Sequence, residues 1–312
     1  MGNRLPNFVV VGAPKCGTTS LYHYLKQHPQ IFLPARKELH YFSYRYMEQL
    51  LAGPGDKNIL ATSCRTFEDY AAYFADAKDE IALGDISPSY FYFNDARTEM
   101  HQRLGDARII VMLRDPVQKA FSQYMHLIRD GRESLDFNAA LAAESERAAR
   151  GYAAMWRYAE SSLYTPTTRR YMDEFGRDNL KVILMDDLVR APAEVLADTF
   201  RFLGVDPTVR VQHDSTFNRS GVPRSRFMAS LISKPNPVTS LARKLLPLSL
   251  TGRVKDVIQR FNTGAKLKLD DRARATLAAY FAADLAELET LLGRPIPWRA
   301  GAAPAQLKAS RG

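Results

Sequence analysis

A single α/β domain with a central, mainly parallel sheet is the fold class that the sequence predicts. Between residues 8 and 204, short apolar runs typical of buried strands alternate with segments of helical spacing. Alternation of this kind is typical of a parallel sheet with helices on both faces. After about residue 214 the strand signals stop. We therefore expect three layers, with the sheet in the middle, and a helical C-terminal region.

The strands are predicted from short segments rich in Val, Ile and Leu, residue types that favour fully buried strands. They cover residues 8–11, 31–33, 81–84, 108–113 and 181–185. Helices are expected at residues 18–27, 116–129, 192–203 and 277–292. Pro116 and Pro192 stand at a first turn, where proline is tolerated, and Gly204 and Gly293 follow a last turn.

The composition excludes several classes of protein. Of the 312 residues, 46% are apolar and 25% are charged, as in ordinary soluble domains. There is no run of 18 uncharged apolar residues, so no stable membrane insertion is expected. The apolar run at 8–11 is too short for a secretory signal, and two cysteines form no disulfide framework. A cytoplasmic location is the expectation.

The net charge of +9 is concentrated in one segment. Residues 219–274 contain thirteen Lys or Arg and three acids, a net charge of +10. A basic stretch favours an anionic partner, such as a phosphorylated cofactor, an acidic glycan, nucleic acid or a membrane surface. A solvated helical surface explains the same charges equally well.

The sequence GAPKCGTT at 12–19 lies between a predicted strand and a predicted helix, where a phosphate-binding loop is expected. Amide groups and the dipole at a helix N-terminus favour an anion there. Gly12 and Gly17 have the spacing of the nucleotide triphosphate loop, but Thr18 stands where that loop has lysine, and Lys15 lies inside it. This arrangement suits a shorter anion, such as a 5′-phosphate that carries a transferable group.

The motif VGAPKCGTTSL at 11–21 resembles the 5′-phosphosulfate loop of the sulfotransferase superfamily. The sequences HP at 28–29 and KELHYF at 37–42 resemble its glycan branch, which includes the heparan sulfate sulfotransferases. That family has a P-loop-like fold and uses 3′-phosphoadenosine 5′-phosphosulfate (PAPS) without a metal. The resemblance spans about residues 6–298 and implies one domain over 1–312, with a helical acceptor region at about 214–268.

The resemblance implies a donor site in three pieces. The 5′-phosphate would be held by Lys15, Cys16, Gly17, Thr18, Thr19 and Ser20. Arg114 at a strand end, with Ser122 eight residues later, matches the 3′-phosphate site, and a guanidinium fork suits phosphate oxygens. Arg219 and Ser220 stand where the family closes a basic loop over the nucleotide, although its usual Lys-Gly-Arg is absent here.

The resemblance assigns the chemistry to Glu38 as general base, because sulfuryl transfer to an alcohol needs a proton acceptor. Lys37 either holds phosphosulfate oxygens or keeps Glu38 ionised, and Lys15 faces the charge that grows on the leaving phosphate. His40 is a rival base with a suitable ordinary pKa. Residues i and i+2 of an extended chain point to one side, so His40 is also placed to orient the acceptor.

The sequence GDISPSY at 84–90 resembles a further family element, but Ile86 replaces the lysine that animal glycan enzymes often have. Asp85 either binds the acceptor or caps the strand end. The aromatic run at 90–93 is interpreted as hydrophobic core rather than as a wall for sugar stacking. The other histidines that we singled out, among them His28 and His126, are expected to be packed side chains.

The function that these features favour is transfer of a sulfuryl group from PAPS to a hydroxyl of a glycan, lipid or small natural product. Adenosine 3′,5′-bisphosphate is the second product, and no metal or nucleic acid is involved. A P-loop kinase is the first alternative, which the missing loop lysine disfavours. A non-enzymatic binder of acidic polymers is the second alternative; it explains the basic segment but not the ordered motifs.

Overall fold

The computed structural model describes residues 4–93, 95–213 and 268–298. Its sheet has five strands in the order β2-β3-β1-β4-β5, and every neighbouring pair is parallel. The strands are β1 (Phe8–Gly12), β2 (Ile31–Phe32), β3 (Ala82–Ile86), β4 (Arg108–Leu113) and β5 (Leu180–Leu184). The predicted α/β class and all five predicted strands are confirmed, with bounds that differ by a few residues.

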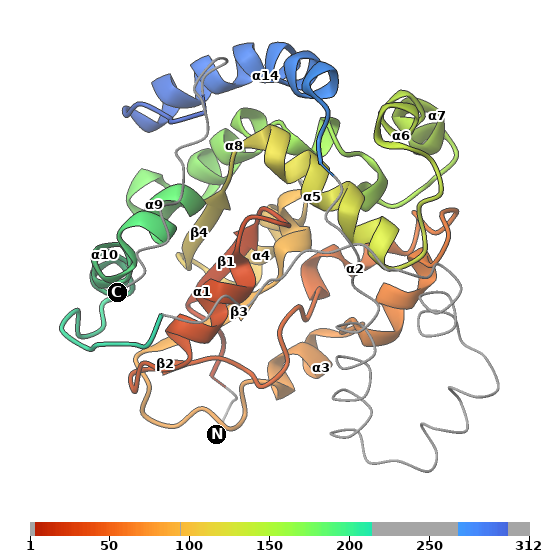
Figure 1. The fold of residues 1–312 in the computed structure, drawn as a ribbon. Helices are drawn as coiled ribbons and strands as arrows, with labels where there is room; N and C mark the ends of the chain where they lie inside the picture. Colours follow the sequence, from red (N-terminus) through yellow and green to blue (C-terminus); the bar gives the residue numbers. More distant parts are fainter. Residues whose placement is uncertain (1–3, 94, 214–267, 299–312) are drawn as a thin grey trace.

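Helices cover the sheet and extend beyond it (Figure 1). They are α1 (Thr18–Leu25), α2 (Tyr41–Met47), α3 (Phe67–Ala72), α4 (Ala96–Leu104), α5 (Pro116–Arg129), α6 (Phe137–Ala142), α7 (Glu144–Ala149), α8 (Thr165–Phe175), α9 (Met185–Arg190), α10 (Pro192–Leu203) and α14 (Asp271–Leu292). In the described parts of the chain, none of them is long and apolar enough to cross a membrane.

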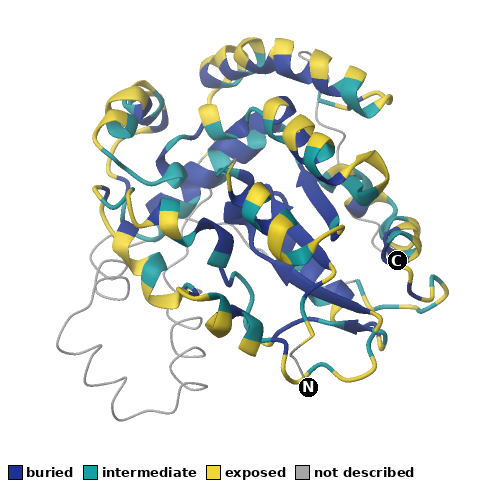
Figure 2. Ribbon diagram, turned by 180° about the vertical axis from the view of Figure 1, so that it is seen from behind, coloured by how far each residue is buried: buried dark blue, intermediate teal, exposed yellow. Residues whose placement is uncertain are grey.

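The position of β1 determines where a site can form. Every residue of β1 is buried, and β1 lies between β3 and β4, so the strand order reverses at this point. Figure 2 shows the strands as the buried layer of the molecule, with exposed residues on the outer sides of the helices. In open parallel sheets, ligands bind beyond the carboxyl ends of the strands at such a reversal.

The start of one helix differs from the prediction for a local reason. Helix α14 begins six residues before Leu277, because the Asp270 side chain caps it by accepting a hydrogen bond from the Ala273 amide at 2.8 Å. The aromatic run after β3 belongs to the core, as expected: Tyr90 and Phe91 are buried. The predicted helical region at about 214–268 lies outside the described residues, apart from its last residue.

The C-terminal helix is joined to the sheet layer by a buried carboxylate. Asp284 of α14 accepts hydrogen bonds from the amides of Tyr164 (2.9 Å) and Thr165 (3.0 Å) at the start of α8. Its carbonyl accepts a third bond from the Thr165 hydroxyl. The Tyr164 hydroxyl in turn donates to the Arg114 carbonyl at 2.8 Å, directly after β4. Helix α14 therefore supports the end of a central strand.

We expect Asp284→Ala to lower the free energy of unfolding by about 1.5–3 kcal/mol, because it leaves buried amides of α8 without their charged acceptor. The matched control is Glu287→Ala on the same helix, which removes an exposed ion pair with Arg169. Such pairs contribute less than about 1 kcal/mol. Denaturant unfolding of both variants tests this, and equal losses would contradict the capping role.

Candidate active site

The loop between β1 and α1 has the geometry of an anion site. Lys15 and Gly17 both have left-handed backbone conformations, with φ of 68° and 90°, and Gly17 is the N-cap of α1. The turn directs the chain so that the first amides of α1 lack carbonyl partners within the helix. These amides and the helix dipole together favour a phosphate-like group.

The side chains of this loop have different surroundings. Thr18 is buried, while Thr19 and Ser20 are partly exposed. Cys16 is fully buried, with its thiol 3.8 Å from the Tyr164 hydroxyl, and burial raises the pKa of that thiol. The Cys16 side chain therefore faces the core, and only its main chain is left to border the loop.

Lys15 is a cation without a carboxylate partner. No ion pair joins its ammonium group to any residue in the three described ranges. Burial lowers the pKa of Lys15 to about 8, and the nearby guanidinium of Arg129 adds to this lowering. The carboxylates of Asp130 and Glu38 act in the opposite direction, and Arg114 adds a smaller lowering. Crowded cations of this kind are stabilised when an anion binds among them.

Arg114 and Ser122 lie where the sequence predicted them. Arg114 directly follows β4, and Ser122 is in the second turn of α5. The carboxylate of the neighbouring Asp115 forms no ion pair with Arg114 in the described structure; it caps α5 by accepting a hydrogen bond from the Val117 amide at 2.9 Å. The other two predicted donor contacts, Arg219 and Ser220, lie outside the described residues.

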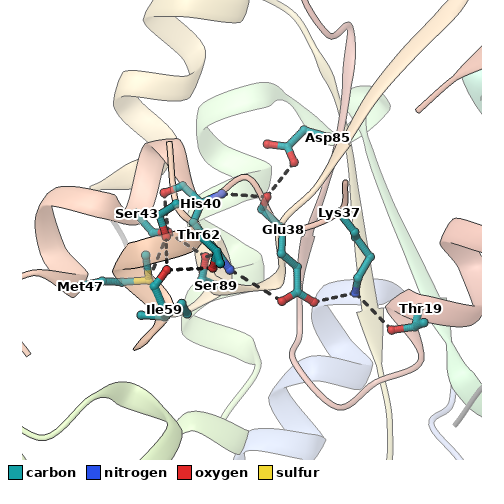
Figure 3. Close-up of polar contacts among 12 residues, drawn as sticks. Thr19, Lys37, Glu38, His40, Ser43, Met47, Ile59, Thr62, Asp85 and Ser89 are labelled. Atoms are coloured by element: carbon teal, nitrogen blue, oxygen red, sulfur yellow. Dashed lines mark hydrogen bonds and ion pairs between the residues drawn. The ribbon is translucent and has the colours of Figure 1, made fainter. Parts of the chain in front are cut away.

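A second group of polar side chains lies beside the loop between β1 and α1 (residues 12–19, the candidate donor loop), on the segment between β2 and α2 (Figure 3). Lys37 Nζ is 2.6 Å from Glu38 Oε1 and donates to Thr19 Oγ1 at 3.2 Å. His40 Nε2 is 3.7 Å from Glu38 Oε2. The Glu38 side chain is 43% exposed, whereas the His40 side chain is 5% exposed. One lysine thus joins the candidate base to the donor loop.

Glu38 and His40 share one side of the chain, as predicted, but for a different reason. Both have left-handed backbones, with φ of 66° and 58°, so the segment is not extended. Such conformations are costly for residues other than glycine and persist where the surroundings enforce them. Here the Glu38 amide donates to the Ile86 carbonyl (3.0 Å), and the His40 amide donates to Ser87 Oγ (3.3 Å).

The charge state of Glu38 follows from its neighbours. Partial burial alone raises the pKa of the Glu38 carboxyl, but the His40 ring, in the state with a hydrogen on Nε2, and the Lys37 ammonium outweigh it. Together they hold that pKa well below its usual range. Glu38 is therefore ionised at neutral pH. A carboxylate stabilised this strongly is a weak proton acceptor until one of these contacts changes.

Asp85 is a buried carboxylate at the end of β3 that holds the residues just after the strand. It is 1% exposed and accepts hydrogen bonds from Ser87 Oγ (2.7 Å) and the Tyr90 hydroxyl (2.8 Å). Burial raises the pKa of Asp85, and these two donors oppose the rise. Of the two roles open in the sequence, Asp85 therefore fits the strand-end role, because its carboxylate is buried in these contacts. Ile86 is buried as well, so the missing family lysine has no substitute at that position.

Two basic side chains near the donor loop were not assigned to the site from the sequence: Arg129 was not singled out, and His126 was expected only to be packed. His126 and Arg129 lie on α5, four and seven residues after Ser122, so all three share one helix face. Arg129 donates to His126 Nδ1 at 2.5 Å. Burial lowers the pKa of His126 to about 3, and the charge of Lys15 acts in the same direction. The helical spacing from Ser122 was the signal that could have identified them.

Comparisons with known proteins agree with this arrangement. A model of the sulfotransferase family matches residues 6–208. The chain belongs to this family. The crystal structure of a sulfotransferase from Alicyclobacillus acidocaldarius superposes with a TM-score of 0.75 and 33% identity, over 94% of this chain and 98% of that one. The family and its fold are therefore shown, as the sequence resemblance implied.

Curated relatives of this sulfotransferase chain are longer proteins. Human carbohydrate sulfotransferase 15 is 30% identical over 43% of the chain and 29% of its own length. Mouse heparan sulfate glucosamine 3-O-sulfotransferase 3B1 is 24% identical over 70% of the chain and 51% of its own length. The membrane-associated sulfotransferase kil1 of Dictyostelium discoideum is 35% identical over 38% of the chain and 22% of its own length. The chain thus spans about half or less of each of these relatives.

The contact between Lys37 and Glu38 can be tested directly. We expect Lys37→Met to raise the pKa of Glu38, because the ammonium 2.6 Å from its carboxylate is removed. Glu38 then takes up its proton at a higher pH than in the parent protein. Carbon-13 NMR titration of labelled glutamate carboxyls measures the shift. Lys26→Met is the control, since Lys26 contacts Tyr22 instead, and an unchanged Glu38 titration in Lys37→Met would contradict the geometry.

Proposed function

We propose that this sulfotransferase moves a sulfuryl group from PAPS to an acceptor hydroxyl, with Glu38 as the general base. One observation carries the proposal: Lys37 contacts both Thr19 in the donor loop and Glu38 in the acceptor segment. This position suits a reaction in which the acceptor gives its proton to the carboxylate while negative charge grows on the phosphate in the loop.

The residues of the donor loop fit the anionic half of PAPS. The N-terminus of α1 and the unpaired Lys15 suit its 5′-phosphosulfate. Arg114, whose guanidinium has no ion pair in the described structure, suits its 3′-phosphate together with Ser122. These groups supply the positive charge that a metal supplies in other phosphate-handling enzymes, so we expect transfer to need no metal.

The reaction follows from these positions. The acceptor O–H bond breaks and its proton moves to the Glu38 carboxylate. The acceptor oxygen forms a bond to sulfur, and the bond from sulfur to the phosphate oxygen breaks. Lys15 and Lys37 stabilise the charge that develops on the departing phosphate. A Lys37 ammonium that also contacts donor oxygens lowers the pKa of Glu38 less, so donor binding strengthens the base.

A saccharide hydroxyl is the acceptor that the comparisons favour. Carbohydrate sulfotransferase 15 and the glucosamine 3-O-sulfotransferase carry glycan substrates in their names, and both resemble this chain. Transfer assays with PAPS and sulfur-35 label, using a panel of polysaccharides, lipids and small alcohols, test the acceptor class. Turnover of ATP with Mg²⁺, or loss of activity in excess EDTA, would favour a kinase instead.

We expect Arg114→Ala to weaken binding of adenosine 3′,5′-bisphosphate by about 1.5–3 kcal/mol, the usual worth of a hydrogen bond to a charged group. Binding of adenosine 5′-phosphate should change little, because it lacks the 3′-phosphate. Isothermal titration calorimetry gives both affinities, with the exposed Arg169→Ala as the control. Equal losses of affinity for the two nucleotides would show that Arg114 does not bind the 3′-phosphate.

We expect Glu38→Gln to reduce kcat by about 10²–10⁴-fold, the usual contribution of a positioned general base. The amide keeps the shape of the side chain but accepts no proton, so donor affinity should stay near that of the parent. His40→Ala should raise the acceptor KM more than it lowers kcat. Near-normal turnover in Glu38→Gln, with turnover lost in His40→Ala, would assign the base to His40.

A further inference from the structure

Two buried hydroxyl groups lie beside His40, and one of them contacts Nδ1, the ring nitrogen that does not face Glu38. Ser89 Oγ is 2.7 Å from His40 Nδ1, and Ser43 Oγ is 2.7 Å from Ser89 Oγ. Ser43 Oγ also donates to the His40 carbonyl at 3.1 Å (Figure 3). Ser43 is 0% and Ser89 is 8% exposed, so solvent does not readily replace these contacts.

The number of protons decides the direction of this chain of contacts. Each serine hydroxyl has one proton to donate. Ser43 donates its proton to the His40 carbonyl, which is a better acceptor than the Met47 sulfur at 3.8 Å. Ser89 then donates to Ser43 Oγ, and Ser89 Oγ accepts from His40 Nδ1. All three contacts are satisfied only when Nδ1 carries a hydrogen, which in the neutral ring is the tautomer with a bare Nε2. If Ser89 donates to Nδ1 instead, Ser43 must donate to Ser89, and its hydrogen bond to the His40 carbonyl is lost.

We propose that the Ser43–Ser89 hydroxyl pair holds neutral His40 in the Nδ1–H tautomer, so that the unprotonated Nε2 faces Glu38. This inference rests on the proposed function, because its consequence concerns Glu38 as the base. Both serines are positioning residues, since they act through His40. The ionisable groups that face the ring are Glu38 on its own segment and, at longer range, Asp85 at the end of β3.

The tautomer determines how His40 affects the base. A hydrogen on Nε2 would donate to the Glu38 carboxylate and stabilise its ionised form, which makes Glu38 a weaker base. A bare Nε2 instead accepts a hydrogen bond from protonated Glu38. During transfer the acceptor proton moves to Glu38 Oε2, and the new O–H group donates to Nε2. The serine pair therefore favours the proton transfer without touching the substrate.

Nitrogen-15 NMR of the full-length protein, labelled at histidine, tests the tautomer without any assay of activity. The His40 signals are assigned by their loss in His40→Gln. We expect the Nδ1–H pattern in the parent protein. In Ser43→Ala, Ser89 loses its acceptor and turns its proton to Nδ1, so the ring should switch to the Nε2–H form. An Nε2–H ring in the parent, or an unchanged tautomer in Ser43→Ala, would overturn the proposal.

Kinetics test the consequence for the base. Ser43→Ala should lower kcat about 3–10-fold and leave the donor KM unchanged. The loss in kcat is the Brønsted response to a fall of about one unit or less in the pKa of Glu38. The acid limb of the kcat profile should move to lower pH, because the pKa of Glu38 falls. Ser89→Thr keeps the hydroxyl and should retain the parent profile. Ser63→Ala, which removes a nearby hydroxyl bound to the Ile59 carbonyl, is the matched control.

The two proposals fail in different ways. Full turnover in Glu38→Gln, or no sulfuryl transfer by the parent protein, would remove the proposed function while the NMR result still reported the tautomer. An acid limb that stays in place in Ser43→Ala, despite a switched tautomer, would overturn the role of the serine pair and leave the proposed function intact.

Discussion

The parallel pairing of β1 with β3 on one side and β4 on the other is the constraint on which the site depends. Parallel strands end at the same edge of a sheet, so the segments that follow these three strands meet there. One supplies the anion-binding turn, one supplies the Asp85–Ser89 support, and one supplies Arg114. A shift of one residue in any of these pairings would turn the strand's side chains to the opposite face and separate the three segments.

Much of this arrangement could be predicted from the chain itself, because its strongest signals are local. A run such as 8–11, followed by a glycine-rich turn and a helix, specifies strand, loop and helix without reference to distant residues. Arg114 and Ser122 were placed correctly because β4 and α5 are continuous and regular. The early start of α14 was missed, because its first turns lack large apolar residues and its cap is a single aspartate.

The contacts between segments that are distant in sequence could not be predicted. Nothing in the residues around Glu38 shows that a lysine beside it also contacts Thr19, or that Ser89 faces the His40 ring. The left-handed backbone at Glu38 and His40 is held by the end of β3 and the residue after it, which accept hydrogen bonds from the amides of both residues. Hydrophobic periodicity and local motifs contain no information about these hydrogen bonds, because the bonds form only when both segments are folded.

The link from Asp284 through Tyr164 to the Arg114 carbonyl has a consequence for the order in which the protein matures on the ribosome. The chain between β1 and β5 contains every strand and most of the site, and it emerges well before residue 284 is made. Until then the first amides of α8 have no carboxylate to accept their hydrogen bonds, and Tyr164, which also contacts Cys16 in the donor loop, is less firmly held. The nascent chain thus has its sheet before the end of β4 and the loop after β1 are fully supported, and α14, the last of the described helices, completes the support of residues that were among the first to be made.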